Sequence, residues 1–82
     1  MIRLTKEANN LHKLTTDNLE IWFSYEIPVA FGIIGGFCEY KMYITKNIWS
    51  STTGKHLNMI DPDGSKRVEN SEFNKLLEEA LK

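Results

Sequence analysis

The sequence has little of three features that often reveal function: cysteine, an excess of one charge, and long apolar runs. Its single cysteine, Cys38, cannot form an internal disulfide, which excludes a disulfide-stabilised secreted scaffold. A formal net charge of −1 excludes the strongly basic field that non-specific binding to nucleic acid or acidic membranes needs. No apolar run approaches a membrane-spanning length, and Arg3, Lys6 and Glu7 interrupt the start of the chain. We therefore expect a cytosolic protein without a signal peptide or membrane partner.

The length of 82 residues predicts a single small domain over residues 1–82. A domain of this size buries only about 60% of its unfolded surface, which leaves little room for an enclosed active site beside the core. The size therefore favours a binding module over an enzyme, and we expect no cofactor.

Residues 1–18 form a polar N-terminal segment that could hold a short helix from about Thr5 to Lys13. Four apolar residues recur there at roughly helical spacing: Leu4, Ala8, Leu11 and Leu14. The Asn9-Asn10 pair weakens this helical pattern. Thr15 to Asn18 reads as a turn.

The segment Leu19–Tyr25 alternates apolar and polar residues, which predicts a half-buried strand with Trp22 on its exposed face. A three-residue connection at Glu26–Pro28 leads to the next apolar run, Val29–Ile34.

Gly35-Gly36 separates two apolar runs and predicts a β-hairpin with a two-residue turn. This register pairs Phe31 with Tyr40 and places Cys38 on the apolar face. A slip by one residue would turn Lys41 towards the core. The three runs together predict an antiparallel β-meander with one apolar face.

The last segment, from about Ser71 to Leu81, has one apolar stripe at helical spacing and an acidic residue, Glu72, in its first turn. We predict an amphipathic helix across the sheet, preceded by a short extended stretch at Lys66–Val68 and a helical turn within Thr52–Ile60. The fold class is thus predicted as α+β: a three-stranded antiparallel β-meander packed against a C-terminal amphipathic helix.

The connection from Asn47 to Asn58 concentrates polar side chains with little to bury, and loops of this kind often bind partners. We expect Lys55 and His56 to be solvent-accessible, with Trp49 at the border of sheet and loop. No nucleophile lies beside His56 in the sequence, so we expect no catalytic residue. The candidate partner-binding residues are Trp49, Ser50, Thr52, Thr53, Lys55, His56, Asn58 and the exposed Trp22.

Two other functions stay open on the sequence. One is nucleic-acid binding by an aromatic and lysine face of the sheet, formed by Trp22, Lys41, Tyr43 and Lys46. The other is calcium binding by a degenerate EF-hand-like loop, formed by Asp61, Asp63, Ser65 and Glu72. Lys66 stands where that loop needs a glycine, so we expect no metal site.

The chain resembles a family of small uncharacterised proteins encoded by bacteriophages and prophages. The resemblance lies in the segments Leu14–Leu19, Trp22–Tyr25, Pro28–Phe31 and above all Asn47–Asn58. The shared segment has the pattern N-x-W-S-x-T-T-G-K-H-L-N. The resemblance implies a phage accessory protein in the bacterial cytosol that binds a host or defence-system protein, and it implies no catalytic residue.

Overall fold

The computed structural model describes residues 2–35, 40–49, 51–61 and 67–81. These residues form one six-stranded mixed sheet, in the order β1 to β6, with two α-helices. The elements are β1 (Arg3–Ala8), β2 (Leu11–Thr15), β3 (Leu19–Ser24), β4 (Ile27–Ile34), β5 (Tyr40–Thr45), α1 (Ser51–Ile60), β6 (Arg67–Val68) and α2 (Asn70–Leu81). The first five strands are antiparallel neighbours, and β6 joins β5 in parallel. The prediction of a three-stranded meander against a single helix is therefore wrong.

The predicted N-terminal helix is also wrong, because residues 3–15 form the β1–β2 hairpin. The apolar residues that suggested a helix are cross-strand partners: Leu4 lies opposite Leu14, and Ala8 lies opposite Leu11. Their spacing is nearly symmetric about Asn9-Asn10, so it fits a hairpin as well as it fits a helix. Asn10 adopts a left-handed φ of 62°, which asparagine tolerates better than most residues.

The β4–β5 hairpin forms, but its predicted register is wrong. Phe31 lies opposite Tyr43 rather than Tyr40, because Tyr40, the first residue of β5, pairs with Ile34 at the end of β4. Gly36 and Cys38 lie outside the described residues. The odd shift moves Tyr43 to the face where it stacks on Phe31, with ring centroids 5.1 Å apart. Lys41 shares this face but lies at its exposed rim, so the register does not bury its charge.

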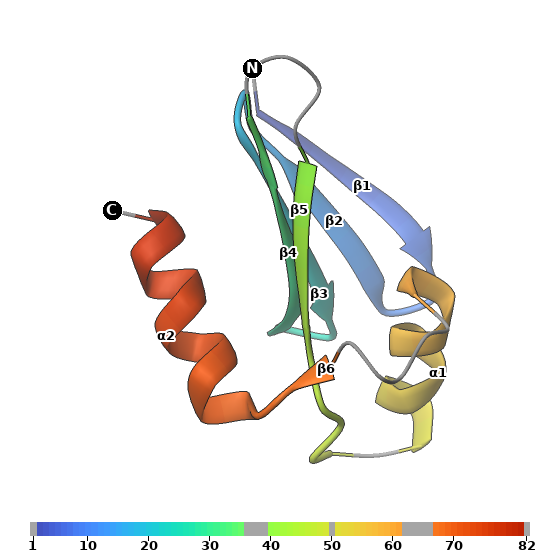
Figure 1. Cartoon of the computed structure of the whole chain (residues 1–82). Coiled ribbons are helices and arrows are strands. Elements are labelled where there is room, and N and C mark those ends of the chain that lie inside the picture. The colour runs from blue at the N-terminus through green and yellow to red at the C-terminus, as the bar shows by residue number, and fades with distance from the viewer. Residues whose placement is uncertain (1, 36–39, 50, 62–66, 82) are drawn as a thin grey trace.

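The two helices lie at opposite faces of the sheet (Figure 1). Each face carries its own hydrophobic cluster. Helix α2 covers one face and contributes Phe73 and Leu77, which pack on Leu19, Ile21 and Phe31. Helix α1 lies at the other face and contributes Leu57. This side chain packs on residues of three strands: Trp22, Val29, Ala30 and Ile44. The alternation of β3 and β4 thus serves two cores rather than one.

The predicted C-terminal helix is confirmed as α2, which begins at Asn70. The Asn70 side chain donates from Nδ2 to the Thr45 hydroxyl, 3.2 Å away, and accepts from Asn74 Nδ2 at 3.2 Å. Before the helix, the Lys46 amide donates to the Val68 carbonyl, and the Lys46 ammonium pairs with Glu69 at 2.5 Å. The end of β5 therefore fixes where α2 starts.

A tyrosine crosses the sheet near the β4–β5 connection. The Tyr40 hydroxyl donates to Glu20 at 3.1 Å, and its ring lies directly over Gly32. A Cβ at Gly32 would stand 2.3 Å from the Tyr40 oxygen, so only glycine leaves room for the ring. Burial of the phenol, together with the negative charge of Glu20 and its hydrogen bond, raises the pKa of Tyr40 to about 12.

Glu20→Gln should lower the pKa of Tyr40 part of the way towards the ordinary value of 10, because burial of the ring persists while the carboxylate charge is removed. Gly32→Ala should also lower it, because the new methyl group displaces the ring. Phenolate absorbance during an alkaline titration measures the change, with Tyr40→Phe identifying the signal of Tyr40.

The raised pKa also has a consequence for folding. The folded protein holds the Tyr40 proton more tightly than the unfolded chain, so this contribution is fully present below pH 10 and is lost as the pH rises towards 12. A Tyr40 that titrates normally in the wild-type protein would contradict the contact with Glu20.

Candidate functional site

The segment singled out by its polar residues is largely helix α1, and it divides between buried and exposed side chains. Thr53 and His56 are buried together with Leu57, while Thr52, Lys55 and Asn58 are exposed. Trp49 is half-buried against the cluster under α1, as the sequence predicted. Ser50 lies outside the described residues. The predicted accessibility is confirmed for Lys55 and wrong for His56.

His56 connects three elements through hydrogen bonds from both ring nitrogens. Its Nδ1 lies 2.6 Å from the Ser24 hydroxyl at the end of β3, and its Nε2 lies 3.0 Å from the Asn9 carbonyl in the β1–β2 turn. A carbonyl only accepts, so Nε2 carries the proton. In the neutral ring Nδ1 then accepts from Ser24, whose oxygen lies 3.2 Å from the Thr53 hydroxyl.

A serine hydroxyl that donates to a histidine invites comparison with nucleophilic catalysis. Ser24 is only 1% exposed and His56 only 4%, so this hydroxyl offers no open position for a substrate. The network instead satisfies polar groups that α1 carries into the interior, which would otherwise cost free energy.

Above this network lies a surface that we call the turn-end surface, formed by the β1–β2 turn, the β3–β4 turn and α1. Its exposed residues are Asn9, Asn10, Tyr25, Thr52, Lys55 and Met59, and Ala8 and the buried His56 complete the lining of its hollow. Figure 1 shows the lower end of the sheet, where α1 lies close to the end of β1. The surface is hollowed by about 450 Å³, and a second hollow of about 450 Å³ lies beside it, lined by Asn10, His12, Tyr25, Glu26 and Ile27.

Tyr25 lines both hollows and has an unusual backbone. Its φ is 59°, in the left-handed region that bulky residues rarely adopt, and its side chain is half exposed. Its amide donates to the Asn10 carbonyl at 2.7 Å, which joins the two turns. Its ring centroid lies 6.0 Å from that of His56. An exposed aromatic residue is therefore held in a strained conformation between two concavities.

Sequence reasoning missed Tyr25, Asn9, Asn10 and Met59. It placed Tyr25 as the last residue of a strand and started the connection one residue later, at Glu26. The available signal was the tyrosine itself, a large aromatic residue next to a turn, where small residues usually stand.

Trp22 does not belong to this surface, and its predicted exposure is wrong. It is 9% exposed and packs in the α1 cluster, with the Lys13 ammonium 5.6 Å from its ring. Tyr43 and Lys41 lie on the opposite face, and Lys46 is paired with Glu69. The residues considered for nucleic-acid binding therefore do not form one surface.

The residues considered for calcium do not come together among those described. Asp63 and Ser65 lie outside the described part, Asp61 is half-buried, and Glu72 is exposed in the first turn of α2. Within residues 2–35, 40–49, 51–61 and 67–81, no three His, Cys, Asp or Glu side chains are grouped to hold a metal ion.

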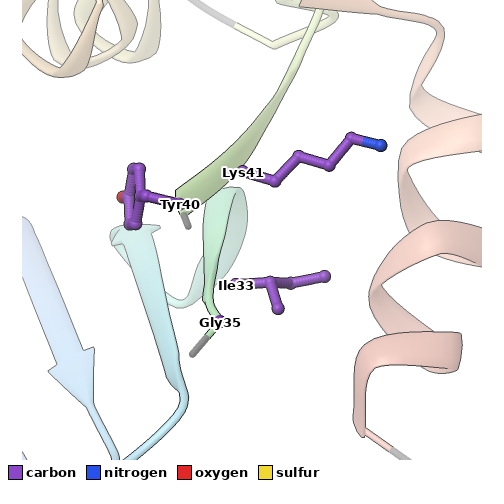
Figure 2. A pocket seen from close by; sticks show the side chains of 4 residues that line it. All are labelled: Ile33, Gly35, Tyr40 and Lys41. Carbon is purple, nitrogen blue, oxygen red and sulfur yellow. The ribbon is translucent and has the colours of Figure 1, made fainter. Parts of the chain in front are cut away.

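A further hollow lies at the β4–β5 end of the sheet (Figure 2). Tyr40 points to one side of the sheet, while Ile33 and Lys41 point to the side of α2. Its described lining, Ile33, Gly35, Tyr40 and Lys41, has no set of converging polar groups.

The protein is a small α+β domain whose sheet is covered by a helix on each face, with the turn-end surface at one end. A family model described as a family of unknown function (DUF8033) matches residues 3–75, and the chain belongs to that family. Searches of curated proteins and of solved structures found no match. Among the described residues, no helix is long and apolar enough to cross a membrane.

His56→Ala should lower the free energy of unfolding by about 2–4 kcal/mol, because it removes the donor to the Asn9 carbonyl, leaves the Ser24 hydroxyl with Thr53 alone, and opens a cavity. Lys55→Ala, the exposed neighbour on the same helix, should change it by less than about 0.5 kcal/mol. Urea denaturation followed by circular dichroism measures both. Equal effects of the two substitutions would show that the buried network contributes nothing.

Proposed function

We propose that this protein is a non-enzymatic binding module that engages a partner protein through the turn-end surface. The observation that carries the proposal is Tyr25, a half-exposed aromatic residue held at a φ of 59°. A non-glycine residue in such a conformation costs on the order of 1–3 kcal/mol, and strain of this kind concentrates at functional sites. Folding alone would be better served here by glycine or asparagine.

The chemistry of the surface supports a protein partner. Tyr25 and Met59 supply exposed apolar area, and Met59 is 59% exposed on α1. Asn9 and Asn10 supply amide groups, and Lys55 supplies one charge at the rim. Tyrosine and methionine are enriched at protein interfaces, whereas binding to nucleic acid relies on many basic groups.

The buried network supports the proposal because it fixes the parts of the surface relative to one another. His56 bonds to the β1–β2 turn, the Tyr25 amide bonds to the same turn, and Ser24 directly precedes Tyr25. A surface that is rigid before binding loses less conformational entropy on association. His56 and Thr53 thus act beneath the interface, while Thr52 and Lys55 lie in it.

The resemblance of Asn47–Asn58 to phage and prophage proteins supports a more specific proposal. The module would be a phage-type accessory protein whose partner is a host or defence-system protein of the bacterial cytosol. The family match is silent on the origin and on the partner.

Tyr25→Gly separates binding from folding. Glycine removes the left-handed strain, worth about 1–2 kcal/mol, while the contact with the His56 ring is lost. The melting temperature should therefore stay the same or rise, whereas capture of the partner from nuclease-treated bacterial lysate should fall at least about tenfold. Lys55→Glu should also weaken capture without unfolding the protein.

Lys75→Glu is the matched control, because it makes the same charge change at an exposed position of α2. Unchanged capture by Tyr25→Gly and Lys55→Glu would place the interface elsewhere. Capture that disappears with nuclease treatment would instead indicate a nucleic acid.

A further inference from the structure

One edge of the sheet is formed by a long strand with exposed apolar side chains. Strand β1 runs over six residues and is the first strand of the sheet, so its outer side has no neighbour among the described elements. The backbone N–H and C=O groups on such an edge can pair with a further strand. The opposite edge strand, β6, has only two residues.

The apolar side chains of β1 lie where neither helix shields them. Leu4 pairs with Leu14, which in turn pairs with Ile21 of the α2 cluster, so Leu4 is on the α2 face of the sheet. Leu4 is nevertheless 67% exposed, and Ile2, just before the strand, is 75% exposed. Two large apolar residues at a free edge are a feature that the fold of one chain does not explain.

The charges of β1 are self-complementary. Glu7 contacts Lys13 at 3.2 Å, and Lys13 lies over Trp22 on the α1 face. Arg3, opposite Thr15, is on this same face by the alternation of the strand. When β1 is paired with a second β1 in antiparallel orientation about Thr5, Arg3 of each copy lies opposite Glu7 of the other.

The same register suits the other face. Leu4 of one copy lies opposite Lys6 of the other, whose aliphatic stem can cover it, and the two Leu4 side chains are diagonal neighbours. The irregularity of β1 lies at Glu7, between Lys6 and Ala8, so residues 3–6 are regular and Glu7 stands at the end of the proposed pairing.

We infer that two copies of this chain associate edge to edge through β1, in antiparallel register about Thr5, to form a continuous sheet. The contact is isologous, as a two-fold axis requires. The axis is perpendicular to the sheet, so both α1 helices lie on one face of the dimer and both α2 helices on the other. The dimer would then present its two turn-end surfaces at opposite ends of the continuous sheet, although the pairing itself is independent of what those surfaces bind.

Sedimentation equilibrium tests the inference with two charge variants, Arg3→Glu and Glu7→Arg. The wild-type protein should dimerise reversibly at concentrations up to about 1 mM. Each variant alone should dimerise at least about tenfold more weakly, because both symmetric contacts then join like charges. An equimolar mixture of the two variants should recover the dimer, because every contact again joins opposite charges.

Lys75→Glu and Glu78→Arg on the exposed face of α2 make the same charge changes and should leave dimerisation unaltered. Leu4→Lys should weaken it without involving the Arg3–Glu7 contact. The amide signals of residues 3–7 should change with protein concentration in nuclear magnetic resonance spectra. A wild-type protein that stays monomeric throughout this range, or a dimer that the Arg3 and Glu7 variants do not weaken, would overturn the inference.

Discussion

The hydrogen bonds of His56 are the interaction on which the arrangement of this protein most depends. Helix α1 fully buries only Thr53, His56 and Leu57, and its Ile60 adds a partly buried apolar contact with the same cluster. Burying one leucine stabilises a fold by roughly 2 kcal/mol, and two hydrogen bonds of a buried imidazole contribute a similar amount. Polar contacts therefore hold α1 in place together with the hydrophobic ones.

This attachment links a structural network to a surface that is suited to binding. Ser24 ends β3, and His56 fixes it by a hydrogen bond inside the protein. The next residue along the chain, Tyr25, projects from the surface. The Asn9 carbonyl fixes the adjacent turn in the same way. The strain at Tyr25 can persist because the surrounding hydrogen bonds leave the turn no relaxed alternative. In our account, the buried residues His56 and Thr53 serve recognition by positioning the turns of this surface.

Some of this structure could be predicted from the sequence, and the failures have physical causes. The stripe of α2 was clear, because its buried residues are all apolar. Helix α1 was only partly anticipated, because two of its three buried residues, Thr53 and His56, are polar. Its buried face therefore shows no hydrophobic periodicity in the sequence. Once α1 is missed, the outer face of β3 appears exposed, and Trp22 is placed in solvent. The β4–β5 register failed because both faces are buried, so apolar residues fit either register. The polar segment did identify Thr52 and Lys55, whereas Tyr25 could be found only through its backbone conformation.

The central claim is that His56 is a fixed internal link between β3, the β1–β2 turn and α1. Nitrogen-15 nuclear magnetic resonance of the imidazole ring tests it most directly, since the two ring nitrogens report which one carries the proton. We predict a single tautomer with the proton on Nε2 and with Nδ1 accepting a hydrogen bond, and a ring proton protected from exchange with solvent. A ring that averages between its two tautomers, with rapid proton exchange as in an exposed histidine, would contradict the account.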